Sequence, residues 1–307
     1  MSNGLITNAR VKFYTQLMEQ GVLSWSPLPQ SSANKFGVSN VPSNADSSQR
    51  LSVRVAHSML KKLEALTGAK AATGKSKLAG QTLGNVFEDL CAQYIENSFK
   101  TLSHLRPGTW SVRQVKSRSA NAIGDFEQYQ HLSELTRLAK ENDELRSFLG
   151  EGYTVAPDVV VTRLPEPDEV INSQATVVDE ITSKAAALRA SIYAGAVPEI
   201  LHASISCKFT MRSDRSQNTR TEALNLLRSR KGRAPHIISI TSEPTPSRLA
   251  SLALGTGDLD CVYHFALYEL KETLEELELE DALELLNTMI SGKRLKDISD
   301  LPLDLAV

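Results

Sequence analysis

The chain has 307 residues, of which 41% are hydrophobic and 23% charged, and its net charge of −2 does not by itself indicate a polyanionic partner; this composition is typical of a soluble globular protein with a sizeable core. Its three cysteines, Cys91, Cys207 and Cys261, are widely spaced without a CxxC pair, which argues against a disulfide framework or a thiolate zinc site and fits a reducing cytosol. The sequence has no apolar signal core at its start and no run of about 18 apolar residues, so we expect a soluble, cytoplasmic protein with no membrane association.

The N-terminal half is expected to be mostly helical. Apolar residues recur at helical spacing in four segments, which are residues 5–20, 51–66, 82–105 and 125–149. Residues 24–50 are rich in Ser, Asn and Pro and predict a long loop, and residues 67–80 predict a shorter one. A loop as long as the first is uncommon in a compact domain unless it has a function. The segment RPGTWSVRQV, residues 106–115, predicts a strand.

The C-terminal half predicts strands that alternate with helices. The predicted strands are PDVVVTR, LHASISCKFT, PHIISIT and DCVYHFALY. The predicted helices are 173–193, 217–230 with Gly232 as its C-cap, a short helix after EPTPSR, and 269–290. This alternation predicts an α/β fold, with a mixed or parallel β-sheet flanked by helices on both faces. Neither GTGD nor TGKSK has the spacing of a phosphate-binding loop, which disfavours a nucleotide triphosphate enzyme.

Charge is unevenly distributed along this half. Residues 208–233 contain eight Lys and Arg but two acids, whereas residues 269–284 contain eight acids and one lysine. The acidic segment has leucines at helical spacing and predicts a helix with a solvated outer face. The basic segment fits either a solvated helix face or a surface for a polyanion.

Three charged residues are placed where they could form a catalytic group. Asp158 opens a predicted strand, Lys208 ends another on the same strand face as Ser206, and Glu222 lies on the helix that follows. Taken singly, a lysine at a strand end usually snorkels and a Pro-Asp pair usually makes a turn. If the two strands are neighbours, however, both carboxylates and the main-chain oxygen of Cys207 could hold a divalent metal. The lysine would then stabilise charge during metal-assisted phosphodiester hydrolysis.

These residues resemble the PD-(D/E)xK nuclease superfamily, in a variant with Ser206 in place of the acid two positions before the lysine. The order Pro157-Asp158, then Lys208, then Glu222 after thirteen intervening residues is similar to that of restriction endonucleases that cut around CCGG. The chain is similar above all to the NgoMIV restriction endonuclease family. The resemblance extends over most of the chain, through VPSNADSS, GQTLGNVFE, APDVVVTR, SISCKFTMRSDRSQNTRTEALNLLRSRKGRAPHI, EPTPSRLASLALGTGDLDCVYHFALYEL and GKRLKDISDLPLDLAV.

The resemblance implies a magnesium-dependent active site. In this family Mg²⁺ is held by residues that match Asp158, Glu222 and the main-chain oxygen of Cys207. Lys208, Ser206 and a further glutamate that matches Glu88 complete the catalytic group. The Cys207 thiol is expected to be a small buried side chain with no catalytic role.

The resemblance also implies which residues read DNA. Arg212, Asp214 and Arg215 match the family's readers of CCGG, and the chemistry agrees, because arginine donates to guanine O6 and N7 while aspartate accepts from cytosine N4. An isolated cluster of this kind would more often be a surface ion-pair network. Residues matching Asp46, Ser48 and Gln81 read the outer base pair of GCCGGC in the family. By themselves the first two also fit a simple turn.

The implied protein is a type II restriction endonuclease that forms a single nuclease domain over residues 1–307. Residues 1–105 would contact the outer bases and residues 106–307 would form the catalytic core. It would cut GCCGGC after the first G as a homotetramer, a dimer of dimers, in a prokaryotic cytoplasm. A cognate DNA methyltransferase would be present in the cell without forming a stable complex. Two alternatives stay open, a CCGG nuclease with another flank such as RCCGGY and a DNA-binding protein without hydrolysis, although clustered acids disfavour the second.

Overall fold

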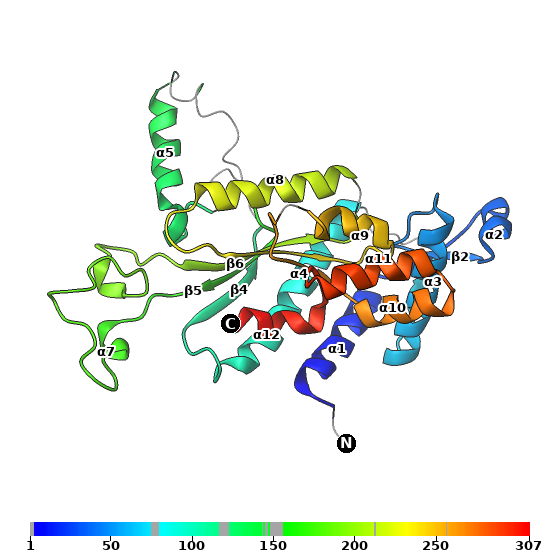
Figure 1. Cartoon of the computed structure of the whole chain (residues 1–307), viewed down its shortest axis with the longest axis horizontal. Coiled ribbons are helices and arrows are strands. Elements are labelled where there is room, and N and C mark those ends of the chain that lie inside the picture. Colours follow the sequence, from blue (N-terminus) through cyan, green and yellow to red (C-terminus); the bar gives the residue numbers. More distant parts are fainter. Residues whose placement is uncertain are drawn as a thin grey trace.

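A six-stranded mixed sheet forms the centre of the molecule (Figure 1). A computed structural model describes residues 3–74, 80–116, 123–142, 144, 147, 156–211, 213–255 and 257–307. The strand order is β4-β5-β6-β7-β8-β9; the β4–β5 and β5–β6 pairs are antiparallel, and the β6–β7, β7–β8 and β8–β9 pairs are parallel. The strands are β4 Trp110–Gln114, β5 Val159–Arg163, β6 Ile200–Lys208, β7 His236–Thr241, β8 Cys261–His264 and β9 Leu295–Asp297. The predicted mixed α/β sheet is therefore confirmed.

The helices account for most of the remaining described chain. They are α1 Leu5–Glu19, α2 Gln30–Phe36, α3 Arg50–Thr67, α4 Gly80–Phe99, α5 Gln130–Glu141, α7 Asp168–Ile171, α8 Ser213–Ser229, α9 Pro246–Ala253, α10 Leu267–Glu276, α11 Glu280–Ser291 and α12 Leu301–Leu305. Short 3₁₀ helices are η1 Lys100–Leu102, η2 Glu127–Tyr129, η3 Ala190–Ile192 and η4 Ile298–Asp300. None of the helices within the described residues is long and apolar enough to cross a membrane.

Alternation along β6 explains why helices cover both faces of the sheet. Ser206 Oγ lies 3.4 Å from Thr219 Oγ1 of α8, whereas the next side chain, Cys207, contacts Cys91 of α4. Successive side chains of a strand point to opposite faces. Helices α8 and α4 must therefore pack on opposite sides of the sheet, as Figure 1 shows.

The prediction of a long loop over residues 24–50 is wrong. This segment forms β1 Ser24–Pro27, the short helix α2 and β2 Asn40–Pro42, and β1 also pairs with β3, Ala72–Thr73. The resulting small sheet, ordered β2-β1-β3, lies next to α3. Its strands have two to four residues, which is too short to produce a clear alternation of apolar and polar side chains.

The predicted helix over residues 173–193 is also wrong. Turns and bends replace it, and only η3 is helical. Asn172 Oδ1 accepts hydrogen bonds from the backbone of Val177 and Val178, and Asp179 Oδ1 accepts from Ile181 and Thr182. Side chains that bind nearby backbone amides in this way compete with helix formation.

The segment after β8 differs from the prediction in two respects. The strand ends at His264 rather than continuing to residue 268, and the single helix predicted over 269–290 is two helices, α10 and α11. The chain reverses between them at Glu278, whose φ of 53° lies in the left-handed region. Leucines on both helices can therefore face the core. The last strand, β9, was not predicted.

A buried ion network joins the N-terminal helix to the C-terminal part of the core. Arg10 of α1 donates to Glu269 of α10 at 2.6 and 2.8 Å and to Asp297 of β9 at 2.8 and 2.9 Å. All three side chains are buried, and Asp297 is fully so. Buried charges are tolerated when they are paired and hydrogen-bonded, as these are. The network therefore fixes α1 against residues almost 300 positions away in the chain.

Arg10→Ala should lower the free energy of unfolding by about 3–5 kcal/mol, because two buried carboxylates would lose their counter-charge. Urea unfolding followed by circular dichroism measures the change. Arg137→Ala, which removes exposed ion pairs to Glu134 and Glu141, is the control and should have little effect. Equal effects of the two substitutions would contradict the assigned role of the Arg10 network.

Candidate active site

The pairing of β5 with β6 brings Asp158 and Lys208 together. Val159 of β5 lies opposite Ile205 of β6, so Asp158, one residue before β5, lies beside the last residues of β6. Its Oδ2 atom accepts hydrogen bonds from the backbone N–H of Cys207 at 2.7 Å and from Lys208 Nζ at 2.8 Å. The two strands are thus neighbours, and their pairing places these two charged groups together at one end of the strands.

The environment keeps the Lys208 ammonium protonated although the pair is largely withdrawn from solvent. The side chains of Asp158 and Lys208 are 8% and 20% exposed. Burial alone would lower the pKa of the Lys208 ammonium, but the Asp158 carboxylate and, to a smaller extent, Glu222 raise it above its usual value. The site therefore presents a charged ammonium next to a carboxylate.

Helix α8 brings Glu222 to the same face of β6 as Lys208. Thr219, one turn before Glu222, contacts Ser206, and residues three apart on a helix share a face. Ser206 and Lys208 likewise share a face of their strand. The electrostatic effect of Glu222 on Lys208 agrees with this placement. Glu222 is partly buried, as expected for an acid between a helix and a sheet.

Helix α4 supplies Glu88 from the opposite face. Glu88 is buried, and its Oε2 accepts a hydrogen bond from Gln114 Nε2 of β4 at 3.0 Å. Burial raises the pKa of the Cys207 thiol, as do Cys91 and, more weakly, Asp158 and Glu88. The thiol is thus a neutral packing group, and Glu88 lies close to the strand end that carries the Asp158–Lys208 pair.

This arrangement limits how a metal could be held. Within the described part of the chain, no three His, Cys, Asp or Glu side chains are arranged to bind a metal ion. The hypothesis requires only two such side chains, Asp158 and Glu222, together with the main-chain oxygen of Cys207. These are hard oxygen donors of the kind that Mg²⁺ prefers, and Mg²⁺ usually keeps several waters and binds substrate phosphates besides. The chemistry of the donor set therefore fits that ion.

The residues predicted to read DNA fall into two groups. Asp46 Oδ1 accepts hydrogen bonds from the backbone N–H and the hydroxyl of Ser48, at 3.0 and 2.7 Å. Gln81 is exposed in the first turn of α4, on the same continuous helix as Glu88. Arg212 lies outside the described residues. Asp214 and Arg215 are in the first turn of α8, but their side chains are outside what the structure describes.

Two residues that sequence reasoning missed contact this region. Arg248 of α9 forms an ion pair with Asp46, and Glu243 lies in the buried connection that precedes α9. Both belong to the segment EPTPSR, in which only a helix start was recognised. Asp46 and Arg248 line a cavity of about 590 Å³, together with Met211, Ser216, Gln217, Arg220, Ser247 and Ser251.

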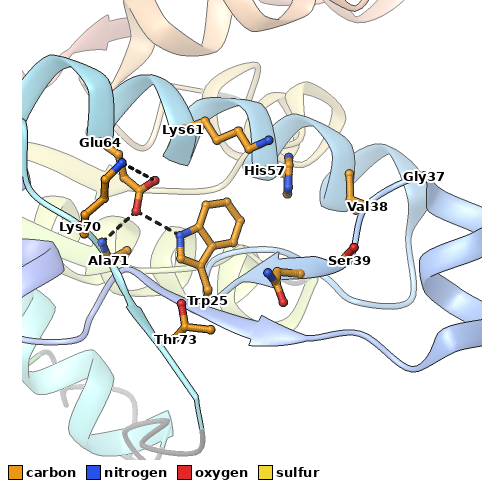
Figure 2. Close-up of a pocket in the computed structure, with 11 residues that line it drawn as sticks. Trp25, Gly37, Val38, Ser39, His57, Lys61, Glu64, Lys70, Ala71 and Thr73 are labelled. Carbon is orange, nitrogen blue, oxygen red and sulfur yellow. Dashed lines mark hydrogen bonds and ion pairs between the residues drawn. The ribbon is translucent and has the colours of Figure 1, made fainter.

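A second cavity, of about 560 Å³, lies between α3 and the small sheet (Figure 2). The Trp25 ring packs edge-on against His57, and the indole N–H donates to Glu64, which also accepts from the backbone of Ala71. Lys61 and Lys70 add positive charge to the lining. None of the predicted catalytic or DNA-reading residues lines this cavity.

The basic stretch RSRKGR, residues 228–233, lies away from the catalytic pair. It begins with the last two residues of α8, a 17-residue helix about 25 Å long that starts beside the end of β6. It leads into the start of β7, whereas Lys208 pairs with Thr241 at the end of β7. The stretch therefore lies at the opposite end of the strands from the Asp158–Lys208 pair.

The Asp46 carboxylate should make stability depend on pH. The hydrogen bond from the Ser48 hydroxyl, followed by that from Arg248, lowers the pKa of Asp46 from 3.8 to about 2. A lowered pKa in the folded state stabilises the protein above the unfolded-state pKa, and this stabilisation disappears as the pH falls toward the folded-state value. Asp46→Asn should therefore be less stable than the unsubstituted protein at about pH 6, and the difference should shrink between about pH 4 and 2.

Urea unfolding at several pH values measures this difference. Ser48→Ala, which removes one hydrogen bond but keeps the carboxylate, should show a smaller deficit with the same pH trend. A deficit of Asp46→Asn that stays constant from pH 6 to pH 2 would contradict the prediction.

Comparison with known proteins identifies the family of the chain. The family model described as the NgoMIV restriction enzyme matches residues 30–307. The type II restriction enzyme NgoMIV of Neisseria gonorrhoeae is 48% identical over 305 residues, which are 99% of this chain and 100% of that relative. The mixed sheet flanked by helices is consistent with a restriction-endonuclease-like fold. The chain therefore belongs to the NgoMIV restriction enzyme family and is a type II site-specific endonuclease that acts on DNA.

Proposed function

We propose that this endonuclease hydrolyses duplex DNA at GCCGGC in the presence of Mg²⁺, and that it cuts each strand after the first G to leave 5′ CCGG overhangs. The main support is the Asp158–Lys208 pair at the end of β6, 2.8 Å apart and held by the backbone of Cys207. Glu222 and Glu88 approach this strand end from opposite faces of the sheet. The non-hydrolytic alternative no longer applies, because the family is one of restriction enzymes.

The catalytic roles follow from charge and position. Asp158, Glu222 and the main-chain oxygen of Cys207 would hold Mg²⁺, which would supply a water of lowered pKa and neutralise charge on the scissile phosphate. Lys208 would donate to a phosphate oxygen or to the attacking water as negative charge develops. Asp158 keeps this ammonium charged and oriented. Ser206 and Glu88 would support the site from either face of β6.

Reading of the inner CCGG is assigned to Arg212, Asp214 and Arg215. They begin four positions after Lys208, so a duplex held by the catalytic group would place its central bases near the start of α8. Arginine forks can pair with guanine and the aspartate with cytosine N4 in the major groove. The few residues between Lys208 and Arg212 would thus link cutting to recognition.

Reading of the outer pair is assigned to Asp46, with Ser48 holding its carboxylate and Gln81 contributing from α4. The contact of Asp46 with Arg248 supports this assignment and extends it. An aspartate can accept from cytosine N4 and an arginine can donate to guanine O6 and N7. An adjacent aspartate and arginine therefore fit a G·C pair. A different flank, such as RCCGGY, is the competing assignment.

The target sequence constrains the assembly. GCCGGC is palindromic, so two copies of the chain related by a two-fold axis would contact equivalent half-sites. We propose that two such dimers associate into a homotetramer. In a prokaryotic cytoplasm, a cognate DNA methyltransferase would protect the host sites without forming a stable complex with this enzyme.

Purified protein with Mg²⁺ should cut a plasmid that contains GCCGGC and leave a matched plasmid without that sequence intact. Sequencing of the ends should show cleavage after the first G, and ends mapped to RCCGGY sites would favour the competing flank. Asp158→Ala should bind the same DNA but fail to cut it, whereas Asp179→Ala, in a distant turn, should cut normally. Equal degradation of both plasmids would refute the proposal.

Arg215→Ala should reduce discrimination between CCGG and sites with one substituted inner base pair by about 1–3 kcal/mol. Relative kcat/KM values on synthetic duplexes measure the change. Arg137→Ala, on the distant helix α5, serves as the control and should leave discrimination unchanged. If Arg215→Ala kept full discrimination, the assignment of the inner contacts would fail.

A further inference from the structure

The connection between β7 and α9, residues 242–245, contains a buried carboxylate that has no part in the proposed chemistry. All four residues are buried, and Glu243 is 0% exposed. A buried carboxylate is costly unless hydrogen bonds satisfy it, so its partners indicate what it is for. Both oxygens of Glu243 have partners, and these belong to different segments of the chain.

One set of contacts reaches the segment that leads to the inner-base readers. Glu243 Oε2 accepts a hydrogen bond from the backbone N–H of Met211 at 2.9 Å, immediately before Arg212. The neighbouring Ser242 hydroxyl donates to the carbonyl oxygen of Phe209. The connection therefore holds the backbone of the short segment between Lys208 and the start of α8.

A second set reaches the outer-base readers. Glu243 Oε1 accepts from the backbone N–H of Thr245 at 3.1 Å, just before α9, and Oε2 lies 3.7 Å from the Arg248 guanidinium. The other amino group of Arg248 pairs with Asp46. In addition, Asn44, two residues before Asp46, donates from Nδ2 to the carbonyl oxygen of Ser242 at 2.8 Å.

We propose that Glu243 is a positioning residue for specificity, which holds the inner and outer DNA-reading segments in register with each other. This inference rests on the function proposed above. Side chains that read bases must be held to within a fraction of an ångström, and a rigid supporting group is the usual means. Because one carboxylate contacts the inner segment at Met211 and the outer segment through Arg248, its loss should relax reading of the inner and outer base pairs together.

Glu243→Gln tests the proposal with almost no change in shape. An amide oxygen can accept from Met211 or from Thr245, but the amide NH₂ must then face the other N–H, and the charge beside Arg248 is lost. Discrimination against single substitutions at both inner and outer pairs should fall on the order of tenfold. The kcat for GCCGGC at saturating DNA should change much less than KM, since Asp158 and Lys208 are untouched. Glu243→Asp keeps the charge and should recover part of the discrimination.

Glu269→Gln is the matched control, because Glu269 is also buried and paired with an arginine but lies in the Arg10 network. It should lower thermal stability and leave discrimination unchanged. Melting temperatures measured by circular dichroism identify the range in which each variant is folded. The inference is overturned if folded Glu243→Gln discriminates like the unsubstituted enzyme, or if Glu269→Gln loses discrimination equally.

Asn44→Ala provides a second test that does not require substitution of Glu243. It removes the contact of the connection with the outer-reading loop alone, so only discrimination at the outer pair should fall. An equal loss at inner and outer pairs, or no loss at either, would count against the inference. If the unsubstituted enzyme itself does not prefer GCCGGC, the proposed function fails rather than the role of Glu243.

Discussion

The ion pair between Asp158 and Lys208 is the constraint on which the site depends. Each charge is largely withdrawn from water, and removal of either would leave the other without its nearest counter-charge. The pair forms because β5 and β6 are antiparallel neighbours with Val159 opposite Ile205. The Cys207 N–H then fixes the carboxylate. The position of the proposed catalytic group is thus set by strand register, and α4 and α8 bring Glu88 and Glu222 from the two faces.

The residues proposed to read DNA lie at the same end of the strands as this pair. Strands β6 and β7 are parallel, so the segments that follow them leave the sheet at the same end of the strands. Lys208 lies opposite Thr241. The chain after β6 enters the Arg212–Arg215 segment, and the chain after β7 enters the connection that carries Glu243. Hydrogen bonds between these two segments join the residues proposed to cut DNA and those proposed to read it to one support.

Hydrophobic periodicity was a sound guide where long elements pack on one large core. The helices near residues 5–20 and 51–66 and the central strands of the sheet agree with prediction, since burial selects their apolar faces. The prediction failed where local hydrogen bonds decide the backbone, as at Asn172 and Asp179. It also failed where strands are too short to show alternation, as in residues 24–50.

The sequence by itself determined the fold class, the enzyme family and the candidate chemistry. The order and spacing of Asp158, Lys208 and Glu222 along the chain are sequence properties, and the family resemblance depends on them. Only the tertiary structure decided which charges meet. Arg248 pairs with Asp46 across 202 positions, and Glu243 contacts Met211 across 32. Such contacts depend on distances between elements after packing, and the spacing of residues along the chain contains no measure of those distances.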